Sequence, residues 1–159
     1  MDQDQWQFLL SEKGQRVLAE TARTPITDEN HLQTASRLRQ VIDPHLAQAV
    51  IETVWLRQRA AEKFSRAGEM YFTREALEQS SSEVVSIHRA RRFFGAGFGY
   101  IADLGCGIGG DAIALAEKAY VLGIDRDWSR LTMARENANA YGNQDRFLPL
   151  LADLNTQPP

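Results

Sequence analysis

The segment from Tyr100 to Tyr141 constrains the fold of this chain more than any other. A short apolar run at 100–104 precedes a glycine cluster, a segment with helical periodicity, and a second apolar run that ends at Asp125. This alternation predicts two parallel strands, at 100–104 and 120–124, joined by a turn and by a helix at 110–118. We therefore expect an α/β fold.

The glycines of the turn stand at positions 105, 107, 109 and 110. Glycine adopts backbone conformations that a side chain forbids, and it lets a ligand approach the main chain closely. The helix that follows presents unpaired amide groups and the positive end of its dipole. Asp125, about 20 residues after the first glycine, stands where a carboxylate accepts hydrogen bonds from ribose hydroxyls. Together these features predict a nucleoside-binding site.

Two other interpretations remain open at this point. Gly105, Gly107 and Gly110 also satisfy the dinucleotide pattern G-x-G-x-x-G, so an NAD-binding oxidoreductase is one alternative. The turn could also be merely a tight connection in another α/β protein. Asp103 argues against a pyrophosphate ligand because its carboxylate would repel one, whereas it suits a ligand with a cationic amino acid group. We accordingly expect no binding of NADH.

The pattern acid-x-G-x-G-x-G at 103–109, followed by Asp125, resembles the class I S-adenosylmethionine-dependent methyltransferases. The resemblance implies S-adenosylmethionine as cofactor, with Asp103 on its amino acid side, Asp125 on the ribose and Asp153 on the adenine. The cofactor-binding residues that it implies are Asp103, Gly105, Cys106, Gly107, Gly109, Asp125, Arg126, Asp153 and Thr73.

The segment YFTREALEQSSSEVVSIHRARRF, followed by IADLGCGIGGDAIALA, is similar to bacterial methyltransferases with a THUMP-like domain and, more distantly, to trimethylguanosine synthase. This resemblance covers roughly residues 50–155 and implies RNA as the methyl acceptor. It also implies that Tyr71, Phe72 and Thr73 help to cover the methionine end of the cofactor. For Tyr71 and Phe72, ordinary core packing is an equal alternative.

Three regions follow from the patterning along the chain. Residues 1–65 read as a bundle of three helices, the first carrying Trp6, Leu9, Leu10, Val17 and Leu18 on one face. Residues 66–99 read as connecting helices, at 74–79 and 83–93, that form a lid. Residues 100–159 read as a partial Rossmann-like domain, with a helix at 128–141 and a third parallel strand at 146–151.

The net charge of −3 gives no general attraction to nucleic acid, so any such contact depends on a local patch. Two clusters of basic residues could bind a polyanion, although each is also interpreted as a solvated helix face. The clusters are Arg57, Arg59, Lys63 and Arg66; and His88, Arg89, Arg91 and Arg92. A non-catalytic module whose helices bind a partner is a further alternative to an enzyme.

Cys106 is the only cysteine, and we interpret it as a small residue that lines the pocket rather than as a nucleophile. The three histidines show no metal-ligand spacing, so we predict no metal site. No apolar run reaches the length of a membrane span, and the N-terminus lacks the pattern of a secretion signal. We expect a cytoplasmic protein that does not bind membranes.

The resemblance also leads us to expect that the chain holds the cofactor-binding half of a methyltransferase, with the catalytic residues beyond Pro159 and the fragment itself inactive. Gln157, Pro158 and Pro159 echo a catalytic motif of the RNA-modifying relatives, but no aromatic residue follows them, and we reject that reading. The first strand would then be an exposed edge, which predicts association of two copies through it.

Overall fold

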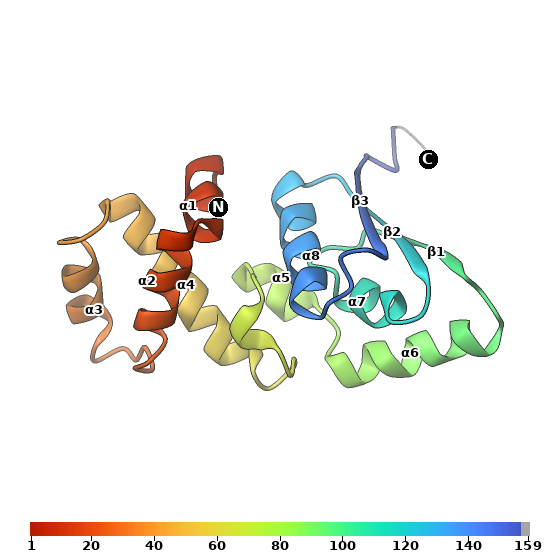
Figure 1. The fold of residues 1–159 in the computed structure, drawn as a ribbon, viewed down its shortest axis with the longest axis horizontal. Coiled ribbons are helices and arrows are strands. Elements are labelled where there is room, and N and C mark those ends of the chain that lie inside the picture. Colours follow the sequence, from red (N-terminus) through yellow and green to blue (C-terminus); the bar gives the residue numbers. More distant parts are fainter. Residues whose placement is uncertain (157–159) are drawn as a thin grey trace. The chain divides into compact units, whose positions relative to one another are not determined.

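The computed structural model describes residues 1–156, so Gln157 to Pro159 and the motif rejected there lie outside the described residues. The chain consists of two compact units, Met1–Arg59 and a second that begins at Ala60. The second unit contains both the sheet and the segment 60–99 that precedes it (Figure 1).

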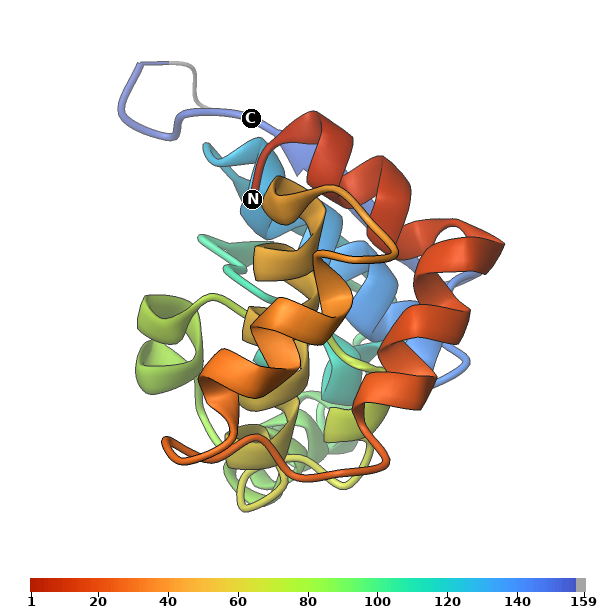
Figure 2. The same ribbon diagram turned by 90° about the vertical axis from the view of Figure 1, so that its left-hand side faces the viewer.

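The first unit is built from helices: α1 (Gln3–Leu10), α2 (Glu12–Thr21), α3 (His31–Leu38) and α4 (Pro44–Ala60), the last ending one residue past the unit. Figure 2 shows these helices from a second side, α1 and α2 in red and α3 and α4 in orange. Their buried residues include Trp6, Leu9, Leu18, Leu38, Val50 and Val54.

The prediction of one continuous N-terminal helix is wrong, because the chain breaks at Ser11. The Ser11 side chain accepts a hydrogen bond from the Gly14 amide and so caps α2, since serine oxygen satisfies an unpaired first-turn donor. A Cβ at Gly14 would lie 1.9 Å from the Phe8 carbonyl oxygen, so only glycine allows this close approach of the two helices. The break also leaves Leu10 at the surface.

The second unit begins with a short 3-10 helix, Ala67–Glu69, followed by α5 (Arg74–Gln79) and α6 (Glu83–Gly95). The sheet then alternates with helices: β1 (Tyr100–Leu104), α7 (Gly110–Ala116), β2 (Tyr120–Asp125), α8 (Trp128–Ala140) and β3 (Phe147–Leu151). These elements match the expected ones closely, although the helix predicted at 110–118 ends at Ala116. The strands are parallel, in the order β1-β2-β3, as the predicted α/β class requires.

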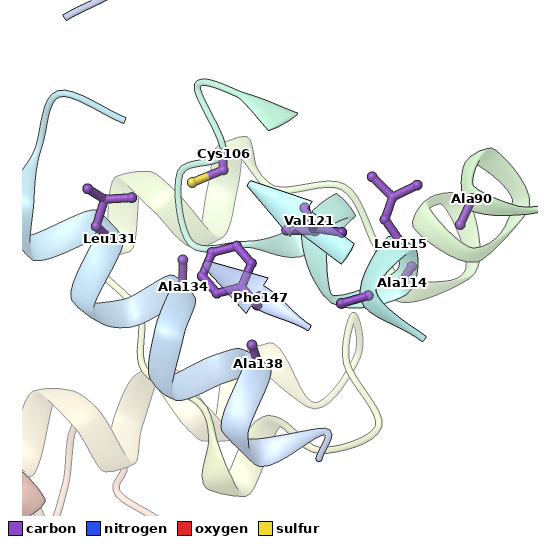
Figure 3. Packing of buried hydrophobic residues seen from close by; sticks show 11 residues of the cluster. Ala90, Cys106, Ala114, Leu115, Val121, Leu131, Ala134, Ala138 and Phe147 are labelled. Carbon is purple, nitrogen blue, oxygen red and sulfur yellow. The ribbon is translucent and has the colours of Figure 1, made fainter. Parts of the chain in front are cut away.

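One face of the sheet is covered by α7 and α8. Cys106, Leu115, Val121, Ala134 and Phe147 are buried in the cluster between the helices and the strands (Figure 3). On the opposite face large apolar side chains remain exposed: Tyr100, Leu104, Tyr120, Leu148 and Leu150. Much of this opposite face is therefore uncovered, and β1 is one of the edges of the sheet.

Candidate functional site

A cavity of about 250 Å³ lies where the glycine turn after β1 meets the connection between α5 and α6. Its walls come from both segments: Ala76, Gln79, Ser80 and Ser81 on one side, and Asp103, Gly105, Cys106, Gly107, Ile108, Gly110 and Asp111 on the other, with Arg130 from α8. The structure therefore brings together most of the residues predicted from the glycine pattern.

The glycine turn is held in place by the end of β2. Gly105, Gly107 and Gly109 all have positive φ, between 56° and 81°, which favours glycine at each of them. The amides of Gly105 and Cys106 both donate to the carbonyl oxygen of Ile124, at 2.8 and 2.9 Å. At Gly109 a Cβ would also lie 3.2 Å from the Cα of Ala134, so glycine allows α8 to pack against the turn.

Asp125 ends β2 and is buried, with 8% of its surface exposed. Its Oδ2 accepts a hydrogen bond from the Gly107 amide at 3.0 Å, and its Oδ1 accepts one from the Asp127 amide at 2.9 Å. Each carboxylate oxygen accepts two hydrogen bonds, so Asp125 retains capacity for a ligand hydroxyl. It therefore fixes the glycine turn and remains a candidate ribose ligand.

Asp103 and Asp111 form an acidic pair in the wall of the cavity. Burial, and then the negative charge of Asp111, raise the pKa of Asp103 to about 6. Arg89 of α6 forms an ion pair with Asp111 Oδ2. Within residues 1–156, neither Asp103 Oδ2 nor Asp111 Oδ1 has a hydrogen-bond partner, although both atoms are buried. A buried carboxylate oxygen without a donor is suited to a cationic ligand.

Cys106 is buried at 7% exposure in the cluster between α7, α8 and the sheet. Burial, with the negative charges of Asp103 and Asp125, raises the pKa of its thiol to about 12. The reactive form of cysteine is the thiolate, which these surroundings disfavour. Cys106 thus serves as a packing residue of the cavity wall.

The connection between α5 and α6 is bonded to Lys63, which lies shortly after α4. The ammonium of Lys63 donates to the carbonyl oxygens of Leu77, Glu78 and Ser80, at 2.7, 3.3 and 3.1 Å. These carbonyls lie at or just beyond the C-terminal end of α5, where helix carbonyls lack internal partners. A Cβ at Gly110 would lie 3.7 Å from the carbonyl oxygen of Ser81, so the connection contacts the turn directly.

The segment before α5 is fastened to the same turn by Asn137, which is fully buried in α8. Its side-chain amide bonds to the backbone of Tyr71 and, at 3.0 Å, to the carbonyl oxygen of Ile108 in the glycine turn. Tyr71 and Phe72 are themselves buried, and the ring of Phe72 lies 5.8 Å from that of Phe64. They therefore pack in the core beneath the site.

Five of the predicted site residues do not line the cavity: Gly109 and Asp125, described above, and Thr73, Arg126 and Asp153. Thr73 caps α5 by accepting a hydrogen bond from the Ala76 amide, and Ala76 itself lines the cavity. Arg126 is exposed immediately after β2. Asp153 follows β3, and its carboxylate accepts hydrogen bonds from Asn155.

Besides Lys63 and Asn137, sequence reasoning missed two further contributors from other elements. Arg130 lines the cavity, where it pairs with Glu75 at 3.3 Å and with Asp127 at 4.0 Å. Gly123 of β2 was also missed: a Cβ there would lie 2.4 Å from the Phe147 ring. The sequence showed that Arg130 lies three residues after Asp127, the N-cap of α8. It did not show that Arg130 lies beside the glycine turn.

Among residues 1–156 no group of three His, Cys, Asp or Glu side chains is arranged to bind a metal ion. Over the same residues, no helix combines the length and the apolar character that a membrane crossing requires.

Family models match two separate parts of the chain. Residues 98–157 match the model described as RNA cap guanine-N2 methyltransferase, and residues 2–60 match a domain of unknown function (DUF8688). The glycine turn, Asp103 and Asp125 all lie in the first of these matches. The part of the chain that contains the glycine turn is therefore similar to this methyltransferase model.

Curated relatives and a solved structure agree with this result. Two uncharacterized S-adenosylmethionine-dependent methyltransferases of Mycobacterium tuberculosis, from two strains, are each 40% identical over 100 residues, which is 58% of this chain and 27% of theirs. The chain thus spans about a quarter of the length of these relatives. The crystal structure of a putative methyltransferase from Porphyromonas gingivalis matches with a TM-score of 0.61 and 23% identity over 83% of this chain and 37% of that one. The α/β fold is similar to that of this solved structure.

Proposed function

We propose that the unit beginning at Ala60 is the cofactor-binding part of an S-adenosylmethionine-dependent methyltransferase. The observation that carries the proposal is the buried, unpartnered Oδ2 of Asp103 in the same cavity as the glycine turn. An acid in that position would repel a pyrophosphate and attract an ammonium group. The similarity of residues 98–157 to a methyltransferase model supports the same conclusion.

S-adenosylmethionine is the cofactor that the comparisons support, and the residues present fit it. Asp103 would face its ammonium group, and Arg130 the carboxylate of its methionine part. Asp125 would accept from the ribose hydroxyls, and Asp153, beyond the next strand, from the adenine amino group. Arg126 and Thr73 flank these positions. The cavity of about 250 Å³ matches the amino acid end of such a ligand rather than the whole molecule.

When bound, this cofactor supplies a methyl group on a sulfonium for transfer to a nucleophile. The contribution of this chain is to bind, orient and exclude water, because in-line transfer depends on positioning and desolvation. Asp103 would hold the amino acid end of the ligand and Asp125 its ribose, while Ser80 and Ser81 of the connection line the cavity opposite the glycine turn. No residue of the chain is assigned to the methyl acceptor.

RNA is the methyl acceptor that we propose for the whole protein. The family model matched by residues 98–157 is described as an RNA cap guanine-N2 methyltransferase, which supports this choice of substrate class. The closer kinship with THUMP-like methyltransferases, and the more distant one with trimethylguanosine synthase, are part of the same proposal.

Calorimetric titration with S-adenosylhomocysteine tests cofactor binding directly. We expect saturable binding, and Asp125→Ala should weaken it by about 1–3 kcal/mol, or roughly 5- to 150-fold, since ribose hydroxyls would lose their acceptor. Asp145→Ala, at an exposed carboxylate that does not line the cavity, should bind as the wild type does.

The same titration separates the alternatives. NADH should show no saturable binding, because Asp103 and Asp111 line the cavity and their carboxylates would repel a pyrophosphate. Micromolar binding of NADH would instead favour the oxidoreductase. Failure to bind either ligand would favour a non-catalytic module that binds a partner through its helices.

A further inference from the structure

A second surface pocket, of about 470 Å³, lies at the C-terminal end of α6 and the loop that follows it. It is lined by Arg89, Arg92, Phe93 and Phe98, and none of these residues lines the proposed cofactor cavity. We call this group of four residues the α6 patch. Its combination of two guanidinium groups and two aromatic rings is chemically distinct from the acidic cavity.

The aromatic half of the α6 patch is exposed. Phe93 is 37% and Phe98 56% exposed, and their rings lie 6.3 Å apart with an interplanar angle of 57°. The loop holds Phe98 in place, because the Phe98 amide donates to the Phe93 carbonyl oxygen and Gly97 turns the chain with φ of 80°. The two rings therefore form a fixed, partly exposed aromatic surface beside the guanidinium groups.

The basic half of the α6 patch is available to an anion. Arg92 is exposed, and among residues 1–156 it pairs with no carboxylate. Arg89 pairs with Asp111, yet its side chain remains 45% exposed. The whole chain carries a net charge of −3, so this positive region is local rather than general.

We propose that the α6 patch binds single-stranded RNA, with a base stacked on Phe98 and Phe93 and the flanking phosphates paired with Arg92 and Arg89. Bases present π faces that stack on aromatic side chains, while guanidinium groups make paired contacts to phosphate. This inference rests on the proposed RNA acceptor and adds a docking surface to it. Since Arg89 also contacts Asp111 in the cofactor cavity, the ion pair links the patch to that site.

An anionic membrane is a less suitable occupant. Membrane association through an amphipathic helix requires a long apolar stripe flanked by cations, whereas the α6 patch offers two rings. Val84 and Val85, the other large apolar residues exposed on α6, lie near its opposite end.

Fluorescence anisotropy with a labelled 12-nucleotide oligouridylate, across a series of salt concentrations, tests this proposal. Phe98→Ala should weaken binding about tenfold, the scale of one lost stacking contact, and Phe98→Tyr should restore it. Arg92→Gln should lower the magnitude of the salt slope by about 0.7, corresponding to one phosphate contact on a single strand. Arg91→Gln is the matched control: it removes the same charge from the same helix at an exposed position outside the pocket.

Each result of these measurements either supports or overturns the proposal. The proposal is overturned if the oligonucleotide does not bind, if Arg91→Gln weakens binding as much as Arg92→Gln, or if Phe98→Ala has no effect. Binding to phosphatidylserine vesicles but not to the oligonucleotide would identify a membrane surface instead. All variants should bind S-adenosylhomocysteine like the wild type. A variant that loses RNA binding but keeps cofactor binding therefore tests the α6 patch alone, whereas loss of cofactor binding would count against the proposed function.

Discussion

The side chain of Asn137 and the backbone of Tyr71 exchange two hydrogen bonds, although the residues are separated by 66 positions in the sequence. The Tyr71 amide donates to Asn137 Oδ1 at 2.7 Å, and Asn137 Nδ2 donates to the Tyr71 carbonyl oxygen at 3.0 Å. The same Nδ2 reaches Ile108 in the glycine turn. One buried side-chain amide thus joins the segment before α5, the helix α8 and the glycine turn.

Asn137→Ala should destabilise the protein by about 3 kcal/mol, because buried backbone groups of Tyr71 and Ile108 would lose their partners. Urea denaturation followed by circular dichroism measures this change. Asn139→Ala provides the control, since Asn139 is exposed on the same helix and its side-chain amide donates to the Glu136 side chain. An equal loss of stability in both variants would contradict the bridging role of Asn137.

The elements and the turn could be predicted from the sequence because they depend on local signals. The apolar strand patterns, the glycines of the turn and the acid at the end of β2 all lie within about 25 consecutive residues of the sequence. Asn137, Lys63 and Arg130 could not be found in this way, since their roles come from contacts between distant segments. From the sequence alone, a polar residue in an amphipathic helix is predicted to be solvent-exposed, because its hydrogen-bond partners in distant segments are not known. The break at Ser11 was missed because helical periodicity continues across it.

The pKa of Asp103, raised to about 6, makes ligand binding dependent on pH. Only the ionised carboxylate attracts an ammonium group, so the affinity for S-adenosylhomocysteine should rise as the pH increases from 5 to 7. Calorimetry at a series of pH values measures this dependence, and Asp103→Asn should remove it. A wild-type affinity that stays constant over this range would contradict the placement of Asp103 beside the ammonium group.

The stability of the unliganded protein should change in the opposite direction. The folded-state pKa of Asp103 lies above its usual value of 3.8, so the folded state binds a proton more tightly than the unfolded state does. The contribution of Asp103 to stability is therefore present below about pH 4 and is lost as the pH rises through about 6. Comparison of Asp103→Asn with the wild type at pH 5 and pH 7 isolates this contribution.

Lys63→Ala should weaken cofactor binding without removing any residue of the cavity wall. Three carbonyl oxygens at the end of α5 would lose their donor, and the connection at Ser80 and Ser81 would no longer be fixed over the turn. We expect a decrease of about tenfold in affinity for S-adenosylhomocysteine, on the scale of a hydrogen bond to a charged group. Lys63→Arg should retain most of the affinity, because it keeps the charge and the donors. Equal affinity of Lys63→Ala and the wild type would show that the connection is positioned by other contacts.

The exposed edge of β1 leads to a final prediction, on self-association. We propose that two copies of this chain pair through β1, because an edge strand presents unpaired amide and carbonyl groups that another chain can match. The Gly105 amide donates to β2 and the Gly99 carbonyl oxygen accepts from it, so alternation along a parallel strand directs the Ala102 backbone outward. Light scattering should show dimers at millimolar concentration, and Ala102→Pro should abolish them by removing one outward amide. Leu148→Lys, on the exposed face of β3, should leave the dimer intact. A clean monomer in the wild type, or loss of the dimer only in Leu148→Lys, would show that the β1 edge does not mediate association.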